Sequence, residues 1–503
     1  MAVGSPGIDA ARGAEPEAVR PTVPFDRFST TQAATKRVLF GHLHSEDAAS
    51  AIARRLRTAI GLGVLADGEK LPKEVDLARQ LGVTAFSLRE ALGTLRREGL
   101  LVTRVGKKGG SYVAHPAVTA SMAGEELVRL SATELRDLGD WRASLTTHAA
   151  WLAARRAPAD TADRLTGCAA EMDAAAGAAA ARRALGRFHV ELAAGAQSMR
   201  LTRAELVVHE EFDWLAQVLF EDDAHRRAVA ASMRSVAAVV GSGDGTAARD
   251  AGERMVSALV AELVRTRLRR IAASVGPARG AGDLAGELQR LFVPLTGMLA
   301  EMAAEVAPAF ARPLTSQELN VEVARLVMRR LGTLDEAVYG LGFMAETGVL
   351  TDVPYWMHWW QRAADGGFDR DYRHQMDPGR DDFYDYAARD YMVRPRETGA
   401  PSAMGPYIDY GGVDDNIVTV SVPVTSGDDF AGVMAADVRV ATLEGVLSPW
   451  LAQADGVCVL LNAESRVLLS NSADHIAGDV LPGDAALTLT EAGCFGWLIG
   501  RAG

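Results

Sequence analysis

Cysteine is scarce in this chain of 503 residues, and its scarcity narrows the class of protein. The three cysteines, Cys168, Cys458 and Cys494, lie far apart and lack the spacing of metal ligands. This pattern argues against a disulfide framework and fits a reducing cytoplasm, where we expect the protein to reside.

Long apolar runs and catalytic motifs are also missing. No uncharged apolar run is long enough to span a bilayer. Residues 1–40 open with charges and no apolar core, so we expect a disordered tail there rather than a signal peptide. The sequence has no nucleophile elbow, phosphate-binding loop or zinc signature, so we expect neither an enzyme nor a cofactor.

The charge is unevenly distributed. The whole chain carries a net charge of −12, but residues 51–110 hold twelve Lys and Arg against six acids, which is +6 and leaves −18 elsewhere. A basic module on an acidic body can bind phosphates while the body stays soluble. The alternative is an ordinary solvated charged surface.

The pattern of residues 41–116 predicts three helices and a hairpin. Ile52, Leu56 and Ile60 mark an amphipathic helix, a second short helix ends at Gly82, and Thr84 is a suitable N-cap for a third. A hairpin with a basic glycine tip follows. Together these elements form a winged helix, whose third helix would enter the major groove of DNA.

The stretches "LPKEVDLARQLGV", "LREALGTLRREGLL" and "GKKGG" make this region resemble the DNA-binding domain of the GntR family of bacterial transcription regulators. The resemblance implies a dimer on operator DNA. Val75 and Ala85 depart from it, because the family usually has Arg at both positions. The DNA-binding residues that we predict are Lys73, Thr84, Ser87, Arg89, Arg96, Lys107, Lys108 and Gly109.

Residues 121–275 are rich in alanine and arginine with helical periodicity, and Arg142 and the Phe188–His189 pair resemble the all-helical effector domain of the FadR-like subgroup. That subgroup commonly binds a metal there. Leu185, Met233 and Met255 stand where its other ligands would be. We therefore expect a structural bundle without metal. The alternative is a rebuilt site formed by Arg142, His148 and His189.

A linker over residues 276–282 leads to a third region, residues 283–503. It begins with a stripe of Leu and Met at helical spacing, interrupted by Pro294. This helix either packs on its own domain, or forms a dimer or carries a signal. Aromatic residues make up only 6% of the chain, yet residues 355–410 contain twelve of the 31. Such clustering is typical of small-ligand pockets, although aromatic core is the alternative.

The segments "GPYIDY", "VTVSVPV" and "FAGVMAADV" make this region resemble the Cache (PAS-like) sensor domains. The alternating Val residues of the second segment predict a half-buried strand. The resemblance implies a site for an amino-acid-like or cationic ligand, although Tyr391–Met392 replaces the usual Trp-Tyr pair. The ligand-binding residues that it implies are Arg389, Tyr391, Tyr407, Asp409 and Asp437.

The sequence thus predicts a multidomain α and α+β protein with a winged helix-turn-helix, an all-α bundle and an antiparallel-sheet sensor. We expect a homodimeric, ligand-responsive regulator of transcription that binds double-stranded operator DNA and no membrane. Two alternatives remain open: the C-terminal domain docks a protein partner, or the chain is an enzyme fused to a DNA-binding domain.

Overall fold

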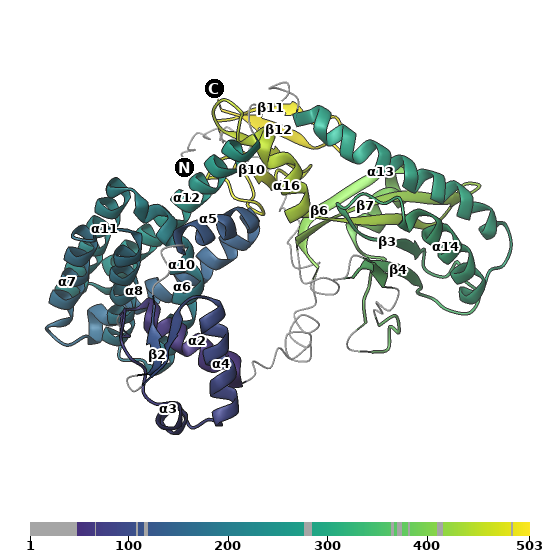
Figure 1. Ribbon diagram of the computed structural model, residues 1–503. Coiled ribbons are helices and arrows are strands. Elements are labelled where there is room, and N and C mark those ends of the chain that lie inside the picture. The colour runs from purple at the N-terminus through teal and green to yellow at the C-terminus, as the bar shows by residue number, and fades with distance from the viewer. Residues whose placement is uncertain are drawn as a thin grey trace, which may run out of the picture.

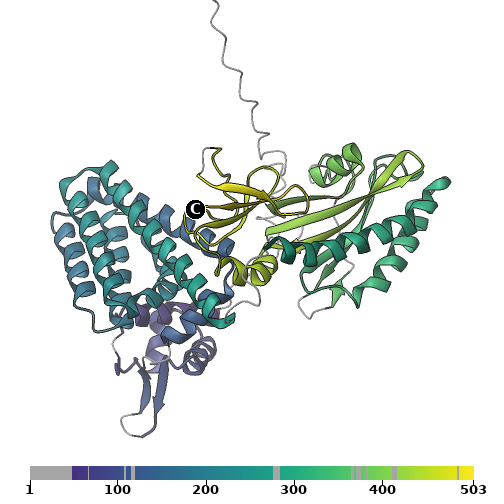
Figure 2. The same ribbon diagram turned by 90° about the horizontal axis from the view of Figure 1, so that it is seen from above.

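The computed structural model describes residues 48–65, 67–106, 109–114, 119–275, 284–363, 367–369, 375–380, 383–409, 416–483 and 486–502. The predicted tail, the linker and the predicted DNA-binding residues Lys107 and Lys108 lie outside the described residues. A winged helix and a helical bundle form one half of the molecule, and a large sheet with two long helices forms the other (Figure 1). A smaller sheet lies between the two halves (Figure 2).

The winged helix forms as its sequence predicts. Its elements are α2 (Ala48–Gly61), α3 (Glu74–Leu81), α4 (Ala85–Arg97), β1 (Leu101–Arg104) and β2 (Gly110–Val113). Ile52, Leu56 and Ile60 are buried, so one face of α2 closes the small core. Gly82 ends α3 in the left-handed conformation, at φ 69°, which glycine adopts without steric cost.

The bundle is entirely helical. Its elements are α5 (Thr119–Arg129), α6 (Ala132–Arg156), α7 (Thr161–Asp173), α8 (Ala178–Gly195), α9 (Met199–Val208), the π-helix η2 (His209–Asp213), α10 (Trp214–Ala216), the 3-10 helix η3 (Gln217–Glu221), α11 (Asp223–Ser242) and α12 (Gly245–Val275). Alanine is the most frequent residue of its core, with twelve of the 35 buried positions, followed by leucine with ten. The single turn of π-helix, η2, is the irregular element, and such turns often occur at functional sites.

The π-helix η2 is also where the bundle meets the winged helix. Glu210 of η2 accepts a hydrogen bond from the Thr58 hydroxyl of α2, and its carboxylate lies 3.9 Å from the guanidinium of Arg57. Burial raises the pKa of Glu210, and the Thr58 and Arg57 contacts oppose that rise. A buried, partly compensated carboxylate therefore joins the DNA-binding helices to the bundle.

The large sheet has six antiparallel strands in the order β5-β4-β3-β8-β7-β6. The strands are β3 (Val338–Ala345), β4 (Met357–Arg362), β5 (Phe368–Asp369), β6 (Ser402–Ile408), β7 (Asn416–Ser426) and β8 (Asp429–Arg439). The predicted alternation is present, but both faces of β7 are buried: Thr419 is 2% exposed and Ser421 is fully buried. The half-buried prediction was wrong, because the aromatic segment and helix α15 (Asp390–Thr398) cover the second face.

Helices α13 (Leu284–Val306) and α14 (Ser316–Leu331) cover the first face of this sheet (Figure 1), with the 3-10 helix η4 (Ala307–Ala311) between them. By length and composition alone, the run Leu284–Ala311 is apolar enough to cross a membrane. Leu288, Phe292 and Leu299 of this run are buried against the sheet. The predicted stripe therefore packs on its own domain, and the helix continues through Pro294.

The second sheet has four antiparallel strands in the order β10-β9-β12-β11. They are β9 (Cys458–Leu461), β10 (Val467–Ser470), β11 (Thr488–Glu491) and β12 (Leu498–Arg501). Phe292 of α13 packs edge-on against Trp497, with ring centroids 5.1 Å apart. The region predicted as one sensor domain therefore contains two sheets that share one long helix.

Helix α16 (Val440–Leu451) joins the two halves of the molecule. It follows β8 directly and carries Glu444, which is 3% exposed. One carboxylate oxygen of Glu444 accepts a hydrogen bond of 2.7 Å from the backbone N–H of Ala132, at the start of α6, and the other pairs with Arg267 of α12. Arg267 also donates to the carbonyl of Leu130, at 2.7 Å. We call these contacts the α16 junction.

Candidate functional sites

The third helix of the winged helix presents its first turn to solvent. Thr84 caps α4 by accepting a hydrogen bond from the backbone N–H of Ser87, at 3.1 Å, as the sequence predicts. Arg89 and Lys73 are exposed. Arg89 bonds to the carbonyl of Ala85, one turn earlier, at 3.1 Å. Both cations are therefore accessible to solvent, Lys73 at the start of α3 and Arg89 near the start of α4.

Two other predicted DNA-binding residues have structural contacts. Arg96 is half-buried, donates to the Ser111 hydroxyl of β2 at 3.1 Å and lies 3.7 Å from Glu74. It therefore holds the wing against α3 and α4. Gly109 forms the tight turn of the wing, where an added Cβ would lie 2.8 Å from the carbonyl oxygens of Arg104 and Gly106.

The second face of the large sheet forms a cavity beneath α15. Four of the five predicted ligand-binding residues line it: Tyr391, Tyr407, Asp409 and Asp437. Met344, Met357, Trp359, Gln361, Tyr384 and Thr419 complete its wall. We call these ten residues the sensor cavity. Gly342 leaves room for Trp359, because an added Cβ would lie 2.6 Å from its ring.

A chain of hydrogen bonds runs across the floor of the sensor cavity. The Thr419 hydroxyl donates to Asp437 at 2.7 Å and accepts from Tyr407 at 2.8 Å. Burial, together with the nearby charge of Asp409, raises the pKa of Asp437 to about 8, although the Thr419 hydrogen bond opposes the rise. Without a cation beside it, this carboxyl is largely protonated at neutral pH.

The phenols of the sensor cavity stay neutral. The hydroxyls of Tyr384 and Tyr391 are 2.7 Å apart, and burial raises the pKa of both groups. Arg389, the fifth predicted residue, occupies the N-cap position of α15 without a side-chain capping bond, and its guanidinium lies 5.7 Å from the Tyr384 ring centroid. The cavity volume is about 20 Å³, roughly the space of one water molecule. A larger ligand would therefore require the α15 side of the wall to move.

A second group of buried polar residues lies inside the bundle. Arg142 forms an ion pair of 2.6 Å with Glu205, and Nδ1 of His209 donates to Asp213 at 2.6 Å. His189 lies 3.7 Å from the same Asp213 carboxylate. We call these five residues the bundle cluster. Burial lowers the pKa of His189 and alone would raise that of Asp213, but Arg142 and the two histidines hold the pKa of Asp213 well below its usual range.

The metal site of the FadR-like subgroup does not fit this bundle. Leu185, Met233 and Met255 are all buried in the apolar core. Within the part of the chain that the structure describes, no group of three His, Cys, Asp or Glu residues is arranged to hold a metal ion. The buried donors that remain are those of the bundle cluster, whose acids are already paired with Arg142 and the histidines.

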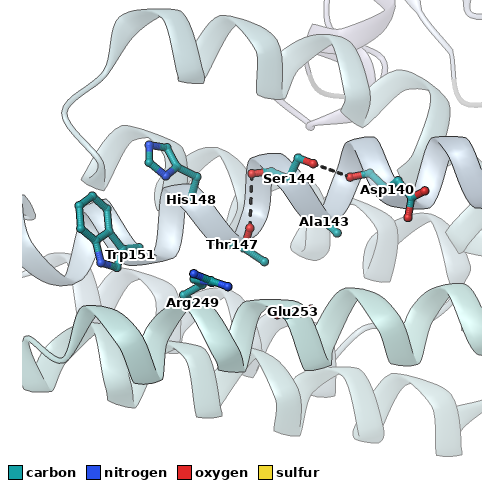
Figure 3. A pocket seen from close by; sticks show the side chains of 8 residues that line it. All are labelled: Asp140, Ala143, Ser144, Thr147, His148, Trp151, Arg249 and Glu253. Carbon is teal, nitrogen blue, oxygen red and sulfur yellow. Dashed lines mark hydrogen bonds between the residues drawn. The ribbon is translucent and has the colours of Figure 1, made fainter. Parts of the chain in front are cut away.

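The rebuilt site predicted from Arg142, His148 and His189 is corrected by the structure. Arg142 and His189 come together, but His148 lies on the surface, where its ring stacks on Trp151 at 5.6 Å. It borders an open groove of about 630 Å³ between α6 and α12 (Figure 3). The nearby Ser144 and Thr147 hydroxyls donate to carbonyls of their own helix.

Sequence reasoning missed Glu205, His209 and Asp213 in the bundle, and Tyr384 and Thr419 in the sensor cavity. The His209–Asp213 pair had a detectable signal, because residues four apart share one face of a helix. Gly186 was a second signal: an added Cβ there would lie 2.3 Å from the His209 ring. Thr419 was not predicted as a site residue because the alternating pattern of its strand indicated that its face was exposed.

Two segments of the chain match family models. Residues 48–113 match the bacterial regulatory proteins of the gntR family, and residues 137–258 match the FCD domain. The first half of the chain therefore combines a GntR-type DNA-binding segment with an FCD domain. Residues 284–503 lie outside both matches.

Two curated transcription regulators are similar to part of this chain. The putative HTH-type transcriptional regulator RmpR of Mycobacterium gastri is 38% identical over 174 residues, which is 34% of this chain and 64% of that protein. The putative L-lactate dehydrogenase operon regulatory protein of Escherichia coli K12 is 36% identical over 124 residues, or 23% of this chain and 46% of that protein. The chain thus spans less than two thirds of the length of these relatives.

Among solved structures, a putative GntR regulator from Rhodococcus sp. RHA1 is similar at 21% identity and a TM-score of 0.26, covering 43% of this chain and 97% of that one. The ligand-binding domain of the Pseudomonas fluorescens chemoreceptor CtaA is similar at 15% identity and a TM-score of 0.30, covering 48% and 97%.

Proposed function

We propose that this protein is a ligand-responsive transcription regulator that binds operator DNA as a homodimer in the cytoplasm. The observation that carries the proposal is the capped, exposed start of α4 in a winged helix with a net charge of +6 over residues 51–110. The two family matches support it. Exposed Lys73 and Arg89 would contact phosphates and position the helix, whereas base edges would supply specificity.

The DNA part of the proposal is tested by selecting bound duplexes from a random pool with the full chain. We expect one enriched sequence with two-fold symmetry, and a weaker affinity for it in the Arg89→Ala variant. The Arg325→Ala variant is the matched control, because Arg325 lies on α14, far along the chain, and pairs there with Glu322. A pool without enrichment would contradict the proposal.

We further propose that the sensor cavity, in a Cache-like domain, binds a small organic cation of the amino-acid type. Two carboxylates meet there among neutral phenols, and only a bound cation would let Asp437 ionise without a large desolvation cost. Arg389 at the edge of the cavity would hold the carboxylate of an amino acid. Binding would favour the arrangement of the dimer in which the cavity is open.

A thermal-shift screen of the full chain against the twenty L-amino acids, putrescine and choline tests the sensor. We expect at least one amine to stabilise the wild type and to lose its effect in Asp437→Ala, with the exposed Asp428→Ala as a control that keeps the effect. If none stabilises the chain and a protein co-purifies with it, the alternative of a docking domain gains support.

The bundle cluster is a second candidate for an effector site. Among the described protein atoms, buried Nε and Nη2 of Arg142, both nitrogens of His189 and Nε2 of His209 have no hydrogen-bond partner. Such groups favour a small carboxylate, which accepts several hydrogen bonds at once. Calorimetric titration with acetate, lactate and succinate tests this role: binding lost in His189→Ala supports it, and no heat from any of the three contradicts it.

A further inference from the structure

One exposed aromatic side chain lies at the start of the recognition helix. Phe86, in the first turn of α4, is 67% exposed, whereas Leu88, Leu92 and Leu95 of the same helix are buried. Single exposed apolar residues are common on protein surfaces. The position of Phe86 is what distinguishes it, because the N-terminal residues of a recognition helix are those that meet base edges.

The side chains from Thr84 to Leu88 offer little hydrogen-bonding readout, and the guanidinium of Arg89, one turn later, bonds to the Ala85 carbonyl. The sequence from Thr84 to Leu88 has no guanidinium and no side-chain amide, which are the groups that recognise guanine and adenine by paired hydrogen bonds. The Thr84 and Ser87 hydroxyls bond within the cap, 3.0 Å apart. The groups left to meet a base at this turn are the methyl of Ala85 and the ring of Phe86, both exposed.

We propose that Phe86 reads the C5-methyl group of thymine in the major groove, so that each operator half-site has thymine where it faces the first turn of α4. Thymine is the one base whose groove edge presents an apolar group, and an apolar side chain is its natural contact. The basic residues of the segment 51–110 would attract the phosphates of the duplex and so hold α4 against it. This inference rests on the proposed operator binding.

The expected discrimination is modest. Burying one methyl group corresponds to about a fourfold change in affinity, and a two-fold symmetric site with two contacts would change about fifteenfold. This is smaller than the discrimination of a paired hydrogen bond from arginine to guanine.

The experiment uses the full chain and the duplex selected from the random pool. Each thymine is replaced in turn by deoxyuridine, which lacks only the methyl group, and binding is followed by fluorescence anisotropy. At one position per half-site we expect wild-type affinity to fall about fourfold, with the same replacement changing the affinity of Phe86→Ala by less than about 1.5-fold. Phe86→Leu should keep the sensitivity, as should Val321→Ala, which shortens an exposed side chain on α14.

The possible results separate the two proposals. A selected duplex that wild type binds equally well with deoxyuridine would overturn the thymine contact and leave operator binding intact. An equal loss in wild type and Phe86→Ala would also overturn it, because the effect would then come from the DNA itself. A change of oligomeric state in Phe86→Ala, with unchanged sensitivity to deoxyuridine, would assign Phe86 to a protein interface instead. Failure to enrich any duplex would contradict operator binding and the thymine contact together.

Discussion

The bundle cluster and the sensor cavity are two buried polar groups with opposite charge balance. In the bundle cluster, Asp213 and Glu205 face Arg142 and two histidines, and the pKa of Asp213 lies well below its usual range. In the sensor cavity, Asp437 faces Asp409 and neutral phenols, and its pKa rises to about 8. Both aspartates are buried, so burial alone does not set the direction of the shift.

The difference indicates different roles. Charges inside the bundle are compensated by protein groups, so the bundle cluster can stabilise a fixed arrangement of α6, α9 and η2. In the sensor cavity, burial and the charge of Asp409 together favour the protonated form of Asp437, and a bound cation would reverse that shift. The following predictions test this contrast, beginning with the largest effect.

Breaking the ion pair of the bundle cluster should have the largest effect. Glu205→Gln removes the carboxylate that pairs directly with the buried Arg142 and leaves Asp213 as its remaining counter-charge, so we expect the free energy of unfolding to fall by about 3 kcal/mol. Urea denaturation followed by circular dichroism measures this loss. Glu126→Gln, which removes an exposed pair with Arg129, is the control and should change stability by less than about 1 kcal/mol. Similar losses in both variants would contradict a structural role for the cluster.

The α16 junction should contribute less to the free energy of unfolding than the ion pair of the bundle cluster. It should contribute more to the cooperative unfolding of the two halves of the molecule. Glu444→Gln keeps an acceptor for the Ala132 N–H and removes the charge facing Arg267, so we expect a loss of about 1.5–3 kcal/mol. Differential scanning calorimetry of the full chain should show one transition splitting into two. A single transition, lowered as a whole, would argue that the halves are coupled elsewhere.

Asp437 should give stability a characteristic dependence on pH. Between its ordinary pKa of 3.8 and the folded value of about 8, the folded protein keeps a proton that the unfolded chain releases. Each unit of rising pH in that window therefore lowers the free energy of unfolding by up to about 1.4 kcal/mol, and the effect ends above pH 8.

Asp437→Asn should remove this slope, whereas Asp428→Asn, at an exposed turn, should keep it. Urea midpoints measured from pH 5 to pH 8 compare the three proteins. A slope that persists in Asp437→Asn would assign the proton to another group, and the contrast with Asp213 would then be lost.

The smallest effect should come from His148. Its ring is exposed and stacks only on Trp151, so His148→Ala should change stability by less than about 0.5 kcal/mol and leave any carboxylate binding by the bundle unchanged. Thermal melts measure the stability, and titration with acetate, lactate and succinate measures the carboxylate binding. Loss of carboxylate binding in this variant would show that His148 takes part in the bundle's binding site after all.

The sequence predicted the elements of the winged helix closely because its signals are local. The Thr84 cap, the Gly82 stop and the periodic leucines of α4 act within a few residues of one another.

The rest of the two sites depends on contacts between distant residues. Asp213, at the end of a π-helical turn, lies 3.7 Å from His189, which belongs to a different helix 24 residues earlier in the chain. Thr419 lines the cavity because α15 covers the face of the strand on which Thr419 lies. Neither contact leaves a pattern in the neighbouring sequence. The packing of two sheets against α13 leaves none either.

The α16 junction has a practical consequence for dissecting this protein into parts. Within α6, Ser131 and Glu134 form a capping box, but the N–H of Ala132 bonds to Glu444, 312 residues along the chain. A fragment that stops after α12 would expose Arg267 and leave the first turn of α6 incomplete. The modular unit is therefore larger than the sequence boundaries imply, because the start of α6 and the buried Arg267 share one carboxylate that α16 supplies.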